Sequence, residues 1–580
     1  MPTAMGAKSS SSKKIKVHKS DTMNYILYLC AQYNHKTTMQ KTFLTIIYLA
    51  MSLTAWAQTD LRPMEDVNKV VDLTLDSLEK AQTARPKPGS SRRGDNPVLV
   101  LVGNSTMRTG TLGNGGNGQW GWGYYAHNYF NEEQITVENQ ALGGTSSRTF
   151  YRRLWPDVKR GIRPGDYVII ELGHNDNGPF DSGRARATIR GISATDSLNV
   201  TIKETGVKET VYSYGEYLRR FVRETRALGA HPILMSLTPR NAYDRPGHVG
   251  RVNETFGLWA RQIAEEMDCP FVDLNEISAQ KYEKMSEWKF NYHFYLDHIH
   301  TSAFGAQLNA RSAAEGLEAC NHPEVAPLKK MMKTELPTTG VKRESGKPVV
   351  FITGDSTVKN TDLDEDGMWG WGSQAASIFD TDKITIMNAA MAGRSCRSYL
   401  REGRWEKVIN DVQPGDFVLI QFGHNDAGKE LDSGKARNEI TGTADSSHVY
   451  RVKTKDGVYN EVVYTFGWYL RKMIDDVREK GATPILVSLT PRNEWTDGRI
   501  ERRNDSFGRW YREVVEQTGV TFLDLHNISA DMFDEMGREE TQPFYKNDHT
   551  HTSKWGAMLN ACGIAKGLRK ANSELAKYLR

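Results

Sequence analysis

The chain is poor in cysteine, with five in 580 residues. The four that follow residue 57 do not recur at matching places along the chain, which argues against a repeated disulfide framework and against a cysteine-based metal site. One bridge, Cys269–Cys320, could still form in an oxidising compartment.

An excess of charge is also lacking. The formal charge of +4 comes from the first 57 residues, which hold seven lysines and one acid, so that 68 basic and 70 acidic residues remain beyond them. This balance predicts no nucleic-acid partner. The 38% hydrophobic and 25% charged content is typical of a soluble globular protein.

Long apolar runs are missing as well. The run Phe43–Leu53, between Lys41 and the small-x-small end Ala55–Ala57, is too short to span a bilayer comfortably. It predicts a secretory signal peptide within residues 1–57, cleaved near Ala57, rather than a retained membrane anchor. We therefore expect secretion to a periplasmic or extracellular location, and Met39 is a candidate for the true start. A lipase is not favoured, because the sequence shows neither an amphipathic membrane helix nor an exposed apolar lid pattern.

The chain is an internal duplication. Five sequence blocks return about 250 residues later, among them WGWG at 120–123 and 369–372 and LTPRN at 237–241 and 489–493. A constant offset of that size indicates two copies of one domain rather than a solenoid. The expected organisation is a helix and linker over 58–96, a first domain over 97–320, a Pro- and Gly-rich linker over 321–347 and a second domain over 348–580.

Each half alternates short apolar runs with helical patterns. In the second half, four runs predict buried strands, and two longer patterns predict helices. The strands are Val349–Thr353, Phe417–Phe422, Pro484–Leu489 and Val520–Leu525, and the helices are Tyr469–Lys480 and Phe507–Gln517. This alternation predicts a parallel sheet flanked by helices, with the polar blocks after the strands meeting at one edge.

These polar blocks contain the groups that ester hydrolysis needs. Ser356 follows a strand, His551 can act as its base, and Asp548, three residues earlier, can fix the tautomer of that histidine. Gly393 and Asn425 can donate hydrogen bonds to the oxyanion of a tetrahedral intermediate. The first half repeats the set with Ser105, Asp297, His300, Gly144 and Asn175. Each block alone is a common turn or cap, but the full set occurs twice in the same order.

This combination resembles the SGNH, or GDSL-type, hydrolase superfamily. The matching blocks are Gly-Asp-Ser (354–356), the glycine of AGRS (Gly393), Gly-His-Asn-Asp (423–426) and Asp-His-Thr-His (548–551). The stretches NAAMAGRSCRSYLREGRW, YTFGWYLRK and NDHTHTS are similar to the rhamnogalacturonan acetylesterase branch. The resemblance implies two tandem flavodoxin-like α/β/α domains, removal of acetyl groups from a pectic backbone, and no metal or organic cofactor.

The first half departs from this pattern at Asn104, where the family has Asp, and this change puts the activity of the first domain in doubt.

Three further features allow two interpretations each. The pairs His298/His300 and His549/His551 fit the triad better than a metal site, because no third ligand is visible. The Trp pairs at 120/122 and 369/371 suit core packing better than sugar stacking. The hairpin expected over His448–Tyr464, like its partner at 200–211, could form a substrate wall or only a sheet edge.

Arg148 and Arg397 are the candidates for binding substrate, since an arginine pairs well with the carboxylate of a uronate. The alternative is a solvated helix face.

The predicted function is a serine esterase that removes acetyl groups from a plant cell-wall polysaccharide, with acetylxylan and other acetylated glycans as alternatives to rhamnogalacturonan. A further alternative is one active domain beside one glycan-binding domain. The oligomeric state is not predicted.

Overall fold

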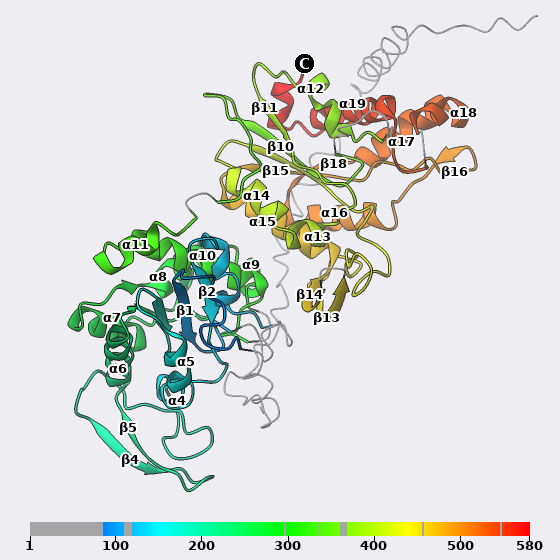
Figure 1. Ribbon diagram of the computed structural model, residues 1–580. Coiled ribbons are helices and arrows are strands. Elements are labelled where there is room, and N and C mark those ends of the chain that lie inside the picture. Colours follow the sequence, from blue (N-terminus) through cyan, green and yellow to red (C-terminus); the bar gives the residue numbers. More distant parts are fainter. Residues whose placement is uncertain are drawn as a thin grey trace, which may run out of the picture.

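The computed structural model describes residues 85–108, 119–294, 297–333, 336–359, 368–454, 457–545 and 548–580. The predicted signal peptide and the helical pattern over 61–84 lie outside these residues. In the described ranges, no helix has both the length and the apolar character needed to cross a membrane. Figure 1 shows two α/β domains that follow one another along the chain.

Each body is built on a five-stranded parallel sheet, as the sequence predicts. The first sheet has the order β2-β1-β3-β6-β9 and the second has the order β11-β10-β12-β15-β18. The first contains β1 (Val98–Gly103), β2 (Thr136–Asn139), β3 (Tyr167–Glu171), β6 (His231–Met235) and β9 (Phe271–Val272). The second contains β10 (Val349–Gly354), β11 (Thr385–Asn388), β12 (Phe417–Gln421), β15 (Thr483–Val487) and β18 (Thr521–Leu523).

Both faces of each sheet are covered, so each central strand is apolar along its whole length. In β1, Val98, Val100 and Val102 point into one core, while Leu99 and Leu101 point into the opposite core. The helices on the first face are α4 (Ser147–Arg153), α5 (Trp155–Gly161), α6 (Tyr214–Ala227) and α7 (Phe256–Glu266). The α-helices on the other face are α8 (Leu274–Tyr282), α10 (Ala303–Ala319) and α11 (Ala326–Lys329). That face also carries the short 3-10 helices η1 (Trp122–Tyr124), η2 (Ala126–Tyr129) and η3 (Pro323–Val325).

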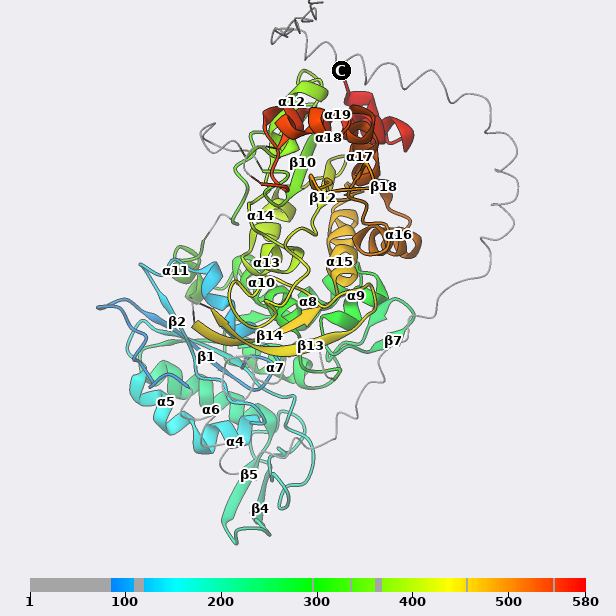
Figure 2. The same cartoon turned by 90° about the vertical axis from the view of Figure 1, so that its right-hand side faces the viewer.

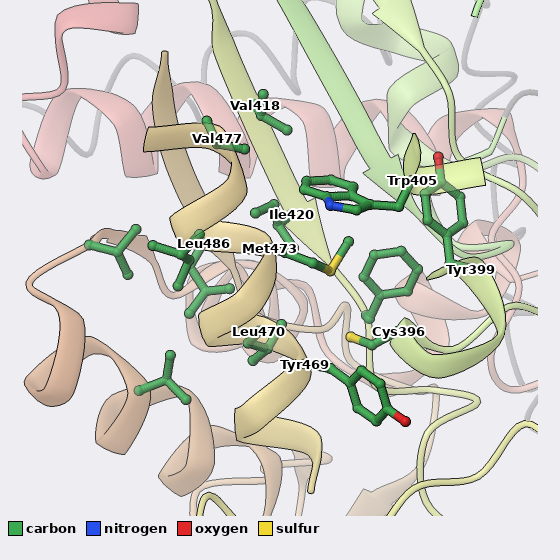
Figure 3. Close-up of a cluster of buried hydrophobic side chains, with 14 of the residues drawn as sticks. Cys396, Tyr399, Trp405, Val418, Ile420, Tyr469, Leu470, Met473, Val477 and Leu486 are labelled. Carbon is green, nitrogen blue, oxygen red and sulfur yellow. The ribbon is translucent and has the colours of Figure 1, made fainter. Parts of the chain in front are cut away.

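The second domain repeats this arrangement. One face carries α13 (Cys396–Arg401), α14 (Arg404–Asp411), α15 (Phe466–Glu479) and α16 (Phe507–Thr518); the other carries α12 (Ala375–Ile378), α17 (Leu525–Met536), α19 (Lys554–Lys570), η5 (Trp371–Gln374) and η7 (Glu574–Tyr578). Figure 3 shows the core on the first of these faces, where Trp405 and Met473 lie against Val418 and Ile420 of β12.

The smaller elements lie at the strand ends. They are the hairpins β4 (Ser197–Thr201)–β5 (Lys208–Tyr212), β7 (Tyr243–Arg245)–β8 (His248–Val249), β13 (Ser447–Thr454)–β14 (Gly457–Tyr464) and β16 (Trp495–Thr496)–β17 (Arg499–Ile500), with α9 (Glu287–Tyr292), α18 (Arg538–Thr541) and η6 (Gln542–Phe544). The predicted hairpins near 200–211 and 448–464 are therefore confirmed as antiparallel pairs. The hairpins β7–β8 and β16–β17 were not predicted.

The linkers are shorter than the sequence indicates. Val325 and Leu328 are buried in the first core, so residues 321–332 end the first domain instead of leaving it. Before the first strand of each sheet, an arginine binds a buried aspartate at the equivalent position of its domain. Arg92 binds Asp166, and Arg343 binds Asp416. The segments before β1 and β10 are thus parts of the repeated unit, because they supply a buried ion pair. The four cysteines in the described residues are free, so the Cys269–Cys320 bridge is not formed.

Candidate active sites

Each candidate nucleophile lies at the carboxyl end of a central strand. Ser105 follows β1, and Ser356 follows β10. Because parallel strands end at one edge of a sheet, the loops after the neighbouring strands reach the same place. The structure accordingly brings the six predicted triad residues together in two sets of three.

The two sets have nearly the same geometry. In the first, His300 Nε2 is 2.8 Å from Ser105 Oγ, and His300 Nδ1 is 2.6 Å from Asp297 Oδ2. In the second, His551 Nε2 is 2.8 Å from Ser356 Oγ, and His551 Nδ1 is 2.7 Å from Asp548 Oδ2. These distances allow proton transfer from hydroxyl to imidazole in both domains.

Each aspartate is held as an anion by its own loop. Asp297 Oδ1 accepts the backbone N–H groups of Ile299 and His300 at 2.7 Å. Burial raises the pKa of Asp297, but the hydrogen bonds and charge of His300 outweigh burial and lower it to about 2. The same contacts in the second domain lower the pKa of Asp548 to about 2. An ionised carboxylate is the form that orients an imidazole and stabilises its protonated state.

The predicted oxyanion donors follow the two strands that flank each nucleophile strand. Gly144 and Gly393 have φ values of +77° and +75°, a backbone conformation that favours glycine. A Cβ added to the preceding residue, Gly143, would lie 3.6 Å from Ser105 Cβ, so this loop touches the nucleophile. Asn175 Nδ2 donates to the Thr145 carbonyl at 3.0 Å, and Asn425 Nδ2 donates to the Arg394 carbonyl at 3.2 Å. Since an amide has two N–H donors, each asparagine keeps one for a substrate.

A buried aspartate next to each asparagine fixes the oxyanion loop. Asp176 accepts the backbone N–H and hydroxyl of Ser147 and the hydroxyl of Thr188. In the second domain Asp426 accepts the Cys396 N–H at 2.9 Å. Burial raises the pKa of Asp176 to about 6 and that of Asp426 to about 7. The sequence predicts a role only for the asparagine of the Gly-His-Asn-Asp motif, whereas the aspartate also ties the helix after the oxyanion loop to the same strand end.

The nucleophile loops reveal a second pair of residues that sequence reasoning missed. Behind Ser105, the Thr106 hydroxyl lies 2.9 Å from Asn104 Oδ1 and 3.2 Å from the carboxyl oxygens of Glu171, which also accepts from Trp122 Nε1. Burial raises the pKa of Glu171 to about 7.

The second domain also places one carboxyl and one amide around its threonine, but at exchanged positions. Thr357 donates to Asp355 Oδ1 at 2.8 Å and accepts from Gln421 Nε2 at 3.0 Å, and Gln421 Oε1 accepts from Trp371 Nε1. Glu171 ends β3 and Gln421 ends β12, the strands that pair with the nucleophile strands β1 and β10. The first domain therefore has its buried carboxyl group at Glu171, whereas the second domain has it at Asp355.

The prediction that Arg148 and Arg397 bind substrate is wrong. Their side chains are 0% and 1% exposed. Each pairs with a glutamate on the neighbouring hairpin, Glu209 and Glu461 respectively. Arg397 also donates to two backbone carbonyls, at 2.7 and 2.8 Å. These arginines tie the hairpin to the helix after the oxyanion loop and cannot reach a polymer.

Other arginines contact the predicted oxyanion residues directly. Arg437 Nη1 donates to Asn425 Oδ1 at 2.8 Å, and its counterpart Arg186 donates to the Gly144 carbonyl at 3.4 Å. Arg184 Nη1 lies 2.9 Å from where a Cβ on Gly144 would be. The side chain of Arg437 is 25% exposed. An arginine eleven or twelve residues after the asparagine of each Gly-His-Asn-Asp block was the available signal.

Three of the four paired tryptophans are buried. They are Trp120, Trp122 and Trp371, as the core-packing interpretation predicts. Trp369 is partly exposed, and its backbone N–H donates to Thr552, the residue after His551, at 2.8 Å. Lys554 Nζ lies 5.2 Å from the centre of its ring. Trp369 is thus placed where a sugar ring beside the catalytic histidine could stack.

Among the described residues, the grouping with metal-ligand geometry is Cys396, Asp426 and Glu439, and it does not include the His-x-His pairs. All three are buried, and the first-domain counterparts are Ser147, Asp176 and Thr188, two of which donate hydroxyl hydrogen bonds to the aspartate. Burial and the neighbouring Asp426 raise the pKa of Glu439, whose carboxyl group stands where the first domain has the Thr188 hydroxyl.

Comparison with known proteins agrees with the fold and supports an α/β hydrolase of carboxylic esters. Residues 99–312 match the family model described as GDSL-like Lipase/Acylhydrolase, and residues 352–557 match the one described as GDSL-like Lipase/Acylhydrolase family. The chain belongs to this family.

The rhamnogalacturonan acetylesterases that it matches are about as long as one of its domains. It is 33% identical over 222 residues to a rhamnogalacturonan acetylesterase of Emericella nidulans, covering 38% of this chain and 84% of the relative. It is 28% identical to the probable rhamnogalacturonan acetylesterase YesY of Bacillus subtilis, covering 40% and 96%. Among solved structures, the acetylxylan esterase Axe2 of Geobacillus stearothermophilus is 21% identical with a TM-score of 0.28, covering 40% and 95%.

Proposed function

We propose that both domains remove acetyl groups from an acetylated plant cell-wall polysaccharide, with rhamnogalacturonan as the first candidate. The observation that carries this proposal is the complete Ser–His–Asp arrangement in each domain, with serine to histidine distances of 2.8 Å. The relatives named as rhamnogalacturonan acetylesterases support the choice of substrate. Arg437 beside the oxyanion loop is partly exposed and pairs with Glu430 at 3.3 Å, and exchange of that carboxylate for a uronate would suit such a polymer.

The mechanism follows from the positions of the groups. Ser356 Oγ attacks the acetyl carbonyl carbon while His551 Nε2 takes the hydroxyl proton. The N–H groups of Gly393 and Ser356 and the free hydrogen on Asn425 Nδ2 stabilise the oxyanion. His551 then gives the proton to the departing sugar oxygen. Water attacks the acetyl-serine by the same route and releases acetate. Ser105, His300, Gly144 and Asn175 act in the same way in the first domain.

Secretion is a further part of the proposal, because a large extracellular polysaccharide must meet the enzyme outside the cell. The apolar run Phe43–Leu53 before Ala55–Ala57 supports it. N-terminal sequencing of the protein from the culture medium or the periplasm should give a chain that begins at or near Gln58. A cell-associated protein that keeps residues 39–57 would contradict cleavage.

Acetate release from acetylated rhamnogalacturonan tests the enzyme function, with acetylated xylan and a small acetyl ester as comparison substrates. Ser105→Ala and Ser356→Ala should each remove one of two activities, and the double variant should remove both. If only Ser356→Ala lowers acetate release, the first domain is a binding domain. If the double variant still releases acetate at the wild-type rate, the proposed mechanism is wrong.

A further inference from the structure

An aromatic cluster joins the two domains. Trp288, Tyr292 and Phe304 of the first domain pack on Tyr464 and Trp468 of the second, and we call these five residues the interdomain cluster. Phe304 stacks on Trp468 with ring centres 5.5 Å apart, and Tyr292 meets Trp468 edge-on at 5.4 Å. Figures 1 and 2 both show α9 beside α15, the helices that carry Trp288 and Trp468.

Buried charges reinforce this contact. Lys289 of the first domain is 4% exposed and pairs with Asp476 and Glu479 of the second. Asp476 also accepts from Trp405 Nε1 in the core of the second domain, at 2.7 Å. A buried ion pair is costly to break, because removing one partner leaves an uncompensated charge. The two domains are therefore held in one fixed arrangement.

The interdomain cluster lies at both ends of the loop that carries Asp297 and His300. Tyr292 precedes this loop, and its hydroxyl donates to the Asp445 carbonyl of the second domain at 2.9 Å. Its carbonyl accepts from Ser302 Oγ at 2.9 Å, which closes the base of the loop. Phe304 follows two residues later and stacks on Trp468. Trp468 thus contacts the chain on both sides of the first catalytic histidine.

The second catalytic loop has no such support. Its base is closed in the same way, by Ser553 Oγ donating to the Pro543 carbonyl at 3.0 Å. Pro543 takes the place of Tyr292, however, and Glu216 takes the place of Trp468 in the shared motif before Tyr-Leu-Arg. Within the described parts of the chain, no aromatic contact joins the loop around Asp548 and His551 to the first domain. Tyr292 and Trp468 are therefore replaced by non-aromatic residues at the matching positions, whereas Phe304 corresponds to another aromatic residue, Trp555.

We propose that Trp468 of the second domain is a positioning residue for His300 of the first domain, so that the first active site depends on the second domain but not the reverse. This inference rests on the proposed serine mechanism. By packing against Tyr292 and Phe304, Trp468 holds the base of the loop and with it the distance between His300 Nε2 and Ser105 Oγ. Small displacements at this distance are expected to reduce catalysis strongly, since proton transfer requires hydrogen-bond reach.

Labelling of both serines in one protein sample tests the proposal. A fluorophosphonate probe reacts with a serine that its histidine activates, and peptide mass spectrometry gives the rate at Ser105 and at Ser356 separately. Trp468→Ala should slow labelling of Ser105 at least tenfold relative to Ser356, and Trp468→Phe should restore more than half of the lost rate. In the Ser356→Ala background, Trp468→Ala should lower kcat on a small acetyl ester with little change in KM.

Two companion variants separate positioning from general damage. Phe304→Ala should repeat the effect from the first-domain side. Trp555→Ala, at the matching position of the second domain, should leave the Ser105 rate unchanged. Equal slowing at both serines in Trp468→Ala would overturn the proposal, as would an unchanged ratio of the two rates. Failure of the wild-type protein to label at either serine would instead contradict the serine mechanism itself.

Discussion

The two nucleophile loops use the same pair of groups in exchanged positions. The first domain has the amide of Asn104 and the carboxyl of Glu171 around Thr106, whereas the second has the carboxyl of Asp355 and the amide of Gln421 around Thr357. One carboxyl and one amide satisfy the threonine hydroxyl and the tryptophan N–H in either order. The comparison indicates that the loop requires one buried acid, and that its place in the chain is interchangeable.

A second difference lies behind the oxyanion loops. Asp176 is surrounded by the hydroxyls of Ser147 and Thr188, while Asp426 faces the thiol of Cys396 and a second carboxyl, Glu439. Burial raises the pKa of both acids in the second domain. The first domain therefore makes this contact with neutral hydroxyl donors, and the second makes it with a thiol and a second carboxyl group.

The largest expected effect tests whether the two triads are equivalent. Asp297→Asn and Asp548→Asn should each lower kcat of their own site by roughly 10³–10⁴-fold, because the amide favours the wrong histidine tautomer. Acetate release should be measured with Asp297→Asn in the Ser356→Ala background and with Asp548→Asn in the Ser105→Ala background. A much smaller loss in the first domain would show that its site does not use the triad in the same way.

Exchange of the acid and amide gives the next largest effect. Asn104→Asp alone places two buried carboxyl groups against Thr106 and should destabilise the first domain by about 2–4 kcal/mol at pH 8. Adding Glu171→Gln should restore most of that stability, since the pair then matches the second domain. Calorimetric unfolding of the four variants in a double-mutant cycle measures the coupling. Additive effects would contradict the exchange.

The sheet, the helices and the triads were predictable because each depends on local pattern. Strands buried on both faces are continuous apolar runs, and the chemistry follows their ends in blocks that recur at one offset. The role of Glu171 was not predictable, because it depends on which side chain faces Thr106 across two strands. Arg148 and Arg397 were misjudged for the same reason: a helix position beside the site does not reveal the glutamate that buries it. The interdomain cluster required the arrangement of two domains that the repeat alone does not specify.

The acid in the first nucleophile loop also predicts a pH dependence. Burial raises the pKa of Glu171 from 4.5 to about 7. Between these values the unfolded chain loses the proton and the folded chain keeps it, so stability falls as the pH rises from about 4.5 to 7 and then levels off. The total loss is roughly 3 kcal/mol. Glu171→Gln should remove this part of the pH dependence when unfolding of the first domain is followed from pH 4 to pH 8. An unchanged slope would show that Glu171 is ionised throughout.

The smallest expected effect concerns the two oxyanion asparagines. Arg437 donates to Asn425 Oδ1 and so fixes the orientation of that amide, whereas Arg186 donates to the Gly144 carbonyl. Loss of one such hydrogen bond costs about 1 kcal/mol. Arg437→Met should therefore lower kcat of the second site about threefold to tenfold on a small neutral acetyl ester, and Arg186→Met should leave kcat of the first site within about twofold. Arg394→Met is the control, since the Arg394 side chain pairs with Glu402 and only its backbone carbonyl contacts Asn425. Equal losses from Arg437→Met and Arg186→Met would mean that the two arginines act on the oxyanion loop in the same way, despite their different partners.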